Sequence, residues 1–230
     1  RKFIERRTQF SGQQIFSTIG YRRVISLTWW RMAIDLCFKK MQKKTEYIGQ
    51  ALVLFSKYGC KRVGMDDVAE TLGISKKTLY EVFENKSDLV HESVSLLLNR
   101  THDKMSRFFQ TSDQTPNPFN NIIHIYRVGL KELRNLSPTF LFSLKKYYPQ
   151  SYRLYDNFTK AVVWTYVLDL LEEAKTEGLL RDNINIKLIC ELFLLRINEV
   201  IVPNRDFFDS YTTDELLEHL IIVPLHGIKK

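Results

Sequence analysis

The segment between residues 44 and about 90 constrains the fold most, because its apolar residues recur with helical spacing in short runs that each end at a glycine. The first run, from Lys44 to Tyr58, is followed by Gly59, and a second run is followed by Gly73. The apolar positions form the stripe of an amphipathic helix in both runs: Ile48, Ala51, Leu52 and Phe55, then Met65, Val68, Ala69 and Leu72. The pattern predicts two helices with tight glycine turns after them.

The residues after Gly73 predict a third short helix. Ser75 can cap it, while Ile74 packs on Leu79 as a hydrophobic staple. Two short helices joined by a tight turn make a helix-turn-helix, whose second helix enters the major groove of DNA with its N-terminal residues leading. Those residues are Lys76, Lys77, Thr78 and Tyr80.

The side chains of this third helix suit contact with a duplex. Lysine reaches phosphates or guanine acceptors, Thr78 offers a hydroxyl and a methyl group, and the Tyr80 phenol can reach a phosphate oxygen. Asn85, Lys86 and Ser87 then open a fourth helix, whose N-terminus attracts anions. The alternative is that the lysines only form a solvated face. Residues 41–100 hold nine Lys or Arg against eight acids, so the ordered motif, and no broad basic field, favours DNA contact.

The stretch from Tyr47 to Leu89 resembles the N-terminal domain of the TetR (tetracycline repressor) family of transcriptional regulators. The residues that carry the resemblance are Ala51, Phe55, Gly59, Asp67, Val68, Ala69, Leu72, Gly73, Ile74, Ser75, Thr78, Leu79, Tyr80, Phe83 and the run from Lys86 to Leu89. The resemblance implies a three-helix DNA-binding head on an all-helical body that dimerises and holds a ligand pocket. By position it implies DNA contacts from Lys76, Lys77, Thr78, Tyr80 and Lys86.

Two positions depart from the family pattern. Gly64 stands where the family usually has a Thr or Ser that caps the second helix and touches a phosphate; glycine still caps tolerably but has no hydroxyl. Val82 replaces a residue that is often aromatic or His, which puts one DNA contact in doubt. Lys43 and Lys44, just before the first helix, are further candidates for phosphate contact. The predicted DNA-binding set is therefore Lys43, Lys44, Gly64, Ser75, Lys76, Lys77, Thr78, Tyr80 and Lys86.

Residues 1–40 form a basic segment without a clean helical or strand period, and we expect it to be poorly structured. It holds nine Lys or Arg against two acids in a chain of net charge +8, so the overall basicity says little about DNA binding. One interpretation is that Met41 is the true start and the preceding residues are translated upstream sequence or an artefact. The alternatives are a basic arm that follows phosphates and an amphipathic segment on a membrane surface.

Residues 91–230 predict a larger all-helical domain after the head at 41–90. An apolar face marks a long fourth helix, and further helices are predicted over 119–135, 138–147, 149–177, 186–201 and 213–228. Proline or glycine separates them, at Pro138, Pro149, Gly178 and Pro203. No alternation of period two persists, which argues against a sheet. The predicted fold class is all-α.

The body is dense in aromatic residues. These side chains either line an apolar ligand pocket or fill the core, and for any single one the core is the more common fate. The pocket candidates are Tyr126, Phe140, Tyr148, Tyr152, Tyr155, Trp164 and Phe193. If they form a pocket, we expect a bulky, largely apolar small molecule as the effector.

The last two long helices are the expected dimer contact, packed as a four-helix bundle across a two-fold axis. The apolar candidates are Leu188, Leu192, Leu195, Leu216, Leu217 and Leu220. Their alternative role is core packing within one chain. A dimer would let two reader helices, about 34–36 Å apart, read the two halves of a palindrome.

Several other classes of protein are disfavoured. Three distant cysteines without a Cys-x-x-Cys pair fit neither a disulfide framework nor a zinc site and favour the cytoplasm. The sequence has no run of about 18 uncharged apolar residues, so no membrane span is predicted. The histidines lack metal spacing and no Gly-rich phosphate loop appears, so we expect neither a cofactor nor an enzyme.

The sequence therefore predicts a ligand-released repressor that binds a palindromic operator as a homodimer. The alternative is a DNA-tethered factor whose body binds another protein in place of a small ligand. A closed cavity lined by aromatics would favour the first reading, and a large exposed apolar patch away from the dimer contact would favour the second.

Overall fold

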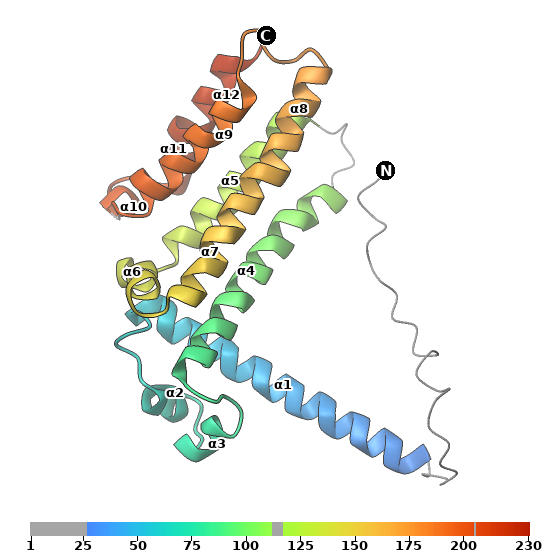
Figure 1. Cartoon of the computed structure of the whole chain (residues 1–230), viewed down its shortest axis with the longest axis vertical. Helices are drawn as coiled ribbons and strands as arrows, with labels where there is room; N and C mark the ends of the chain where they lie inside the picture. The colour runs from blue at the N-terminus through green and yellow to red at the C-terminus, as the bar shows by residue number, and fades with distance from the viewer. Residues whose placement is uncertain (1–26, 112–116, 205) are drawn as a thin grey trace. The chain divides into compact units, whose positions relative to one another are not determined.

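The computed structural model describes residues 27–111, 117–204 and 206–230, and the regular structure in these ranges is helical, apart from an isolated bridge between Leu180 and Lys229. The fold class predicted from the sequence is confirmed (Figure 1). The elements are α1 (Leu27–Tyr58), α2 (Met65–Thr71), α3 (Lys76–Tyr80), α4 (Lys86–Thr111), α5 (Pro118–Arg134), α6 (Pro138–Tyr147), α7 (Pro149–Ala161), η1 (Val162–Val167), α8 (Leu168–Thr176), α9 (Ile186–Leu195), η2 (Arg196–Ile201), α10 (Asp206–Ser210), α11 (Thr213–Leu217), η3 (Glu218–Ile222) and α12 (Val223–Ile228).

The first helix begins earlier than the sequence suggested. α1 starts at Leu27, inside the segment that we expected to be poorly structured, so that prediction is wrong from Leu27 onward. The physical reason is that no glycine or proline occurs between Gly20 and Gly49, so nothing interrupts the helix. Residues 1–26 of the segment lie outside the described residues.

The predicted helices of the body are present, and their boundaries coincide with the predicted ones or differ by one residue. Proline occupies the first turn of α5, α6 and α7, where its missing N–H costs no intrahelical bond. The segments labelled η1, η2 and η3 are π-helical turns within three longer helices. The sequence reading missed these turns and α10, which at five residues is too short to show a period.

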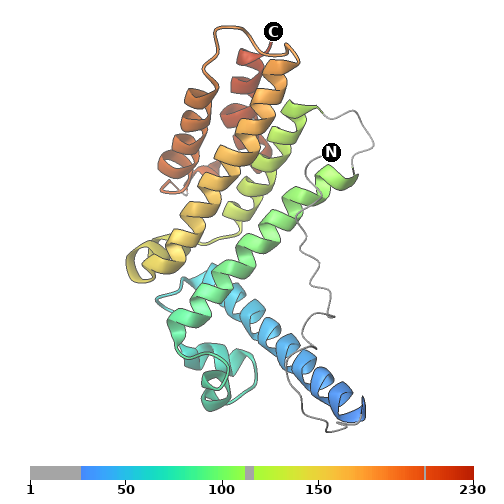
Figure 2. The ribbon, with the colours of Figure 1, turned by 45° about the vertical axis from the view of Figure 1, so that its right-hand side comes forward.

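Helix α5 is central to the body. It packs against α4, α8 and α11, and the views in Figures 1 and 2 show it among these helices. Its buried face carries Phe119, Ile122, Ile125, Tyr126, Leu130 and Leu133. These side chains belong to one apolar core that continues from the head helices into the body.

Helix α6 docks on the end of α1 and on the turn that follows it. The Ser137 N–H, just before α6, donates to the Ser56 carbonyl at 2.7 Å, and the Cys60 N–H donates to Ser143 Oγ at 3.0 Å. Gly59, which ends α1 with φ +83°, lies against Thr139 so closely that a Cβ there would be 2.8 Å from Thr139 Oγ1. The head and the body are thus joined by α6 as well as by the continuous helix α4.

Candidate nucleic-acid interface and ligand cavity

The turn between α2 and α3 has the local geometry that the sequence predicted. Gly73 has φ +64°, a conformation that L side chains rarely adopt. Ser75 is the N-cap of α3, and its Oγ accepts the Thr78 N–H at 3.1 Å. Leu79 is fully buried beneath the helix, so the opposite face of α3 is turned outward.

That outward face carries the predicted reader residues. Lys76 and Lys77 are exposed, the Tyr80 side chain is 44% exposed, and Thr78 is half-buried with its Oγ1 2.9 Å from Ser75 Oγ. Their exposed position is as the sequence predicted, while their contact with DNA stays a prediction.

The two lysines of this face differ in their partners. Lys76 Nζ lies 2.8 Å from Asp66 Oδ2 on α2, and this hydrogen bond raises the pKa of the Lys76 ammonium. Among the described residues, Lys77 has no ion pair or hydrogen bond through its ammonium. A phosphate therefore competes with Asp66 for Lys76, whereas Lys77 is ready to bind one. Asp66 lies in the first turn of α2, and the sequence gave no signal for its pairing with Lys76.

Lys86 does not share the outward face of α3. It is half-buried; its Nζ donates to the Lys61 carbonyl at 3.3 Å and lies 5.9 Å from the centre of the Tyr148 ring. Burial lowers the pKa of this ammonium. The structure therefore places Lys86 at the junction of the head with the turn between α6 and α7, which the sequence motif did not indicate.

The other predicted DNA-binding residues lie in different surroundings. Lys44 pairs with Glu92 at 2.5 Å and lies 5.5 Å from the centre of the Phe83 ring. Lys43 is exposed. Gly64 is the N-cap of α2, and its N–H donates to Asp67 Oδ2 at 2.7 Å, whereas Gly64 itself has no side chain to accept an N–H from the first turn.

A cavity of about 90 Å³ lies in the body. Side chains of α4, α5, α7, η1, α9 and η2 line it, almost all of them apolar. Two of the seven predicted pocket residues, Tyr126 and Tyr155, line it, together with Phe158. The volume is well below the roughly 300–1,000 Å³ of pockets that bury a drug-sized molecule. A bulky ligand, as the sequence suggested, does not fit inside it as it stands.

The other five predicted pocket residues have different positions. Phe140 is core, and Phe193 packs its ring edge against Tyr126 at 5.3 Å. Tyr148 donates its hydroxyl to the Cys60 carbonyl at 3.4 Å, at the junction with the head. The Tyr152 ring lies 6.1 Å from the Tyr155 ring and 5.8 Å from Lys145 Nζ. Trp164 is a half-buried residue of η1. The aromatic content of the sequence marked the cavity region but not which rings reach it.

The predicted dimer leucines separate into two groups. Leu188, Leu192 and Leu195 of α9 are 50%, 39% and 53% exposed, so they form an apolar stripe on the surface of the chain. Leu216 and Leu217 are buried in the core of the same chain, and Leu220 packs partly against that core. The prediction that Leu216 and Leu217 form the dimer contact is therefore wrong, because α11 packs against α5 and these two side chains are buried in the same chain.

No group of His, Cys, Asp or Glu in residues 27–111, 117–204 and 206–230 is arranged to hold a metal ion. Over the same ranges, no helix is long and apolar enough to cross a membrane.

Comparisons with known proteins agree with this geometry. Residues 48–93 match the family model "Bacterial regulatory proteins, tetR family". The chain is 29% identical over 164 residues to YvaF of Bacillus subtilis (strain 168), an uncharacterised HTH-type transcriptional regulator; the match spans 71% of this chain and 84% of YvaF.

Solved structures show the same fold at low sequence identity. The ketosteroid transcriptional regulator KstR2 of Mycobacterium tuberculosis is 16% identical, with a TM-score of 0.58 over 82% of this chain and 95% of KstR2. A protein of Saccharomonospora viridis in complex with choline is 15% identical, with a TM-score of 0.70 over 83% of this chain and 99% of that one. The head geometry and the match over residues 48–93 show that this part of the chain is similar to the helix-turn-helix domain of the TetR family of bacterial regulatory proteins, and the two solved structures share the fold over 82% and 83% of the chain.

Proposed function

We propose that the protein is a ligand-released repressor, which binds a palindromic operator as a homodimer. The observation that supports this most directly is the outward face of α3, which Ser75 caps and on which Lys76, Lys77 and Tyr80 are exposed. A helix that presents cations and hydroxyls at its N-terminal end is suited to the major groove.

The exposed stripe on α9 supports the homodimer. Leu188, Leu192 and Leu195 recur at i, i+4 and i+7, and Val200 of η2 is a further exposed apolar residue, at 37%. A two-fold axis through such a stripe buries it against its own copy. The resulting dimer carries two copies of α3, and their spacing sets the distance between the operator half-sites.

The position of α4 supports control by a ligand. α4 starts at Lys86, within the head, and its residues Leu97, Leu98, Thr101 and Met105 line the cavity in the body. A molecule bound there changes the packing of a helix that continues into the head. If it binds one arrangement of the heads more tightly than the other, the population shifts and the operator is released. The apolar cavity in the body favours this function over the alternative of a protein-binding body.

The proposed DNA face is tested with Lys77→Ala and Tyr80→Ala. The probe is a duplex selected from random sequences by the wild-type protein, and affinity is measured over a range of salt concentrations. Loss of one phosphate contact reduces the slope of log K against log[salt] by about 1, and loss of one base contact costs about 1–3 kcal/mol.

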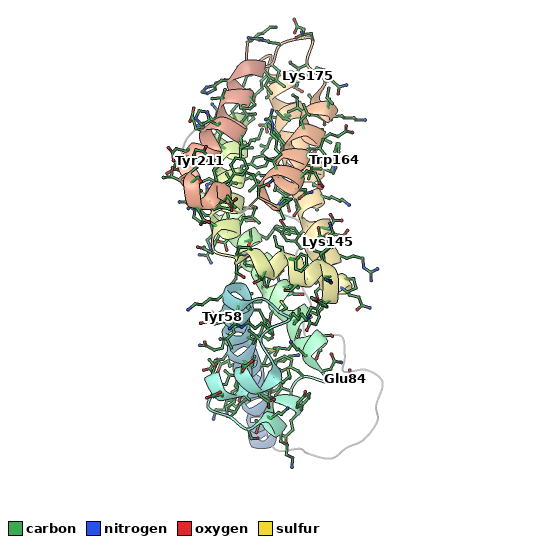
Figure 3. The ribbon with its side chains drawn as sticks, turned by 90° about the vertical axis from the view of Figure 1, so that its left-hand side faces the viewer. Tyr58, Glu84, Lys145, Trp164, Lys175 and Tyr211 are labelled. Atoms are coloured by element: carbon green, nitrogen blue, oxygen red, sulfur yellow. The ribbon has the colours of Figure 1, made fainter. Side chains whose placement is uncertain are left out.

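The matched control is Lys175→Ala, an equally exposed lysine on α8 at the far end of the body from the head (Figure 3). It removes the same charge and leaves the salt slope unchanged. If both head variants bind the duplex like the wild type, α3 is not the reading helix.

The proposed dimer is tested with Leu192→Lys, which places a charge in the stripe. We expect sedimentation to show monomers at concentrations where the wild type is dimeric. The control is Leu179→Lys, since Leu179 is similarly exposed, at 37%, but lies outside the stripe. A Leu192→Lys protein that stays dimeric contradicts the assignment of this face.

A further inference from the structure

A second hollow lies where the start of α4 meets the corner between α6 and α7. Its volume is about 490 Å³, within the roughly 300–1,000 Å³ of pockets that bury small molecules. The first turn of α4, the residue before it and the first turn of α7 contribute most of its lining. The two helices pack against each other (Figure 2). The hollow shares no lining residue with the apolar cavity of the body, so the two are separate.

The first turn of α7 carries N–H groups without acceptors. Tyr148 is the N-cap residue, but its side chain does not cap the helix, and its hydroxyl donates to the Cys60 carbonyl at 3.4 Å. The first bond of the helix runs from the Tyr152 N–H to the Tyr148 carbonyl at 3.0 Å. The N–H groups of Gln150 and Ser151 come before it, and no described residue accepts a hydrogen bond from either. An open helix N-terminus of this kind attracts an anion.

The Ser151 side chain adds a further polar group without a partner. Ser151 is only 3% exposed and lines the hollow. Its hydroxyl makes no hydrogen bond within the part of the chain that the structure describes. There, the Tyr126 hydroxyl is the one unpartnered side-chain group sealed from solvent, so the Ser151 hydroxyl is open to the hollow. Buried polar groups nearly always have a partner, which indicates that a ligand supplies one here.

The α4 side of the hollow carries a carboxylate without a counter-ion. Asp88, in the first turn of α4, is half-buried and lines the hollow. Its Oδ2 accepts the Glu84 N–H at 3.3 Å, and it forms no ion pair with any described residue. No lysine or arginine of the described ranges lines the hollow. The Asp88 charge therefore repels an anion and attracts a cation.

We infer that the hollow binds a small zwitterion, a molecule with one carboxylate and one ammonium group, as in an amino acid. The carboxylate accepts from the N–H groups at the start of α7 and from the Ser151 hydroxyl, and the ammonium donates to Asp88. A simple anion would leave Asp88 unpaired, and a simple cation would leave Ser151 without an acceptor. The inference goes beyond the proposed function and does not depend on it, because neither α3 nor the apolar cavity takes part.

The probes are two zwitterions with different charge separation, L-alanine and 4-aminobutyrate, and two molecules with one charge each, butyrate and n-butylamine. Binding is followed at fixed pH and ionic strength by NMR of protein labelled with ¹³C in its histidine rings, of which the chain has five. His91 lines the hollow and reports on binding, and His91→Gln assigns its signal. The exposed His226 of α12 reports on effects elsewhere.

In the wild type, at least one zwitterion is expected to shift the His91 signal and to leave the His226 signal unchanged. It should bind at least about tenfold more tightly than butyrate or n-butylamine, because each of these lacks one of the two charged contacts. If neither zwitterion shifts the His91 signal, the inference is overturned. Equal affinity for the better zwitterion and either single-charge probe overturns it as well.

Ser151→Ala tests the carboxylate contact, with Ser93→Ala as its matched control. Ser93 is also a buried serine, but it donates to the Leu89 carbonyl at 2.7 Å and does not line the hollow. Affinity for the zwitterion should fall about three- to tenfold in Ser151→Ala, since one hydrogen bond is lost, and should be unchanged in Ser93→Ala. Equal affinity of the two variants contradicts the role of Ser151.

Asp88→Asn tests the ammonium contact, with the exposed Asp169→Asn of α8 as its control. Asparagine keeps an oxygen that can accept the Glu84 N–H. Affinity for the zwitterion should fall at least about tenfold, while affinity for butyrate should not fall, because the repelling charge is gone. Asp169→Asn should bind every probe like the wild type. Unchanged binding of the zwitterion by Asp88→Asn, or an equal loss for the zwitterion and butyrate, contradicts the site.

Discussion

Replacing Gly59 by alanine should destabilise the protein through two separate effects. Gly59 has φ +83°, and a left-handed backbone costs an L-residue about 1–2 kcal/mol. The new Cβ would also lie 2.8 Å from Thr139 Oγ1 and 3.2 Å from the Thr139 carbonyl oxygen. Since the carbonyl belongs to the backbone of α6, α6 must shift, and overpacking of this kind costs about 1–3 kcal/mol. The expected loss is thus about 2–5 kcal/mol.

Two other glycines separate the backbone effect from the contact. Gly73 and Gly178 have φ of +64° and +72°, and a Cβ at either would meet no atom within 4 Å. Gly73→Ala and Gly178→Ala should therefore cost only the backbone part, about 1–2 kcal/mol. The excess for Gly59→Ala measures how tightly α6 is held against the head.

The assay is urea unfolding followed by circular dichroism, at one fixed protein concentration because an oligomer's stability depends on it. A Thr139→Ala substitution in the Gly59→Ala background should recover part of the loss, since Oγ1 is removed while the carbonyl stays. If all three glycine variants lose the same free energy within about 0.5 kcal/mol, the close approach of α6 to Gly59 is refuted.

Three further outcomes follow from individual contacts. Ser75→Ala should lower the free energy of unfolding by about 0.5–2 kcal/mol, because the cap of α3 is lost, and should weaken duplex binding. Ser75→Asp should keep the cap and the stability but still weaken binding, because its carboxylate repels phosphates. Urea unfolding measures the first effect and DNA titration the second. Arg134→Lys should lower the free energy of unfolding by about 1.5–3 kcal/mol. The Arg134 guanidinium donates to Thr213 Oγ1 at 2.7 Å and to the Phe208 and Tyr211 carbonyls, and a lysine ammonium cannot reach all three acceptors. An unchanged urea midpoint would contradict this. Burial raises the pKa of the Cys60 thiol to about 12, so the folded state disfavours its thiolate. Its contribution to stability is complete below the unfolded-state pKa near 9 and declines as the pH rises from about 9 toward 12; the pH dependence of the urea midpoint should be weaker in Cys60→Ala over this range.

Most of the fold was accessible from the sequence because its helices are delimited by local signals. Pro138, Pro149 and Gly178 mark boundaries that depend on one residue each, and the Ser75 cap needs only a neighbour three positions away. The start of α1 could not be placed from the sequence, because the residues around Leu27 show only a weak helical period and no cap or breaker marks the first turn.

The parts that the sequence did not predict depend on long-range packing. The contact of Lys86 with the Tyr148 ring joins residues that are 62 positions apart in the sequence. Whether a leucine of α9 or α11 is exposed or buried depends on how these helices pack in the body. Gly129 offered a local signal, since an isolated glycine inside a helical pattern destabilises the helix relative to alanine and often has a packing or functional role. The cavity that Gly129 lines is formed by residues far apart in the sequence, which come together only in the folded chain.

The π-helical turn η2 determines where the outer face of α9 continues. A π turn holds about one residue more than an α turn, and its bond is seen from the Val202 N–H to the Ile197 carbonyl at 2.9 Å. Glu199 and Val200, four and five positions after Leu195, are both exposed, so the row of leucines runs into a wide turn that carries a carboxylate beside a valine. Deleting one residue between Leu195 and Glu199 would place Val200 four positions after Leu195, where an α-helix continues the row. The length of this segment, as much as its composition, is fixed by the surface it presents.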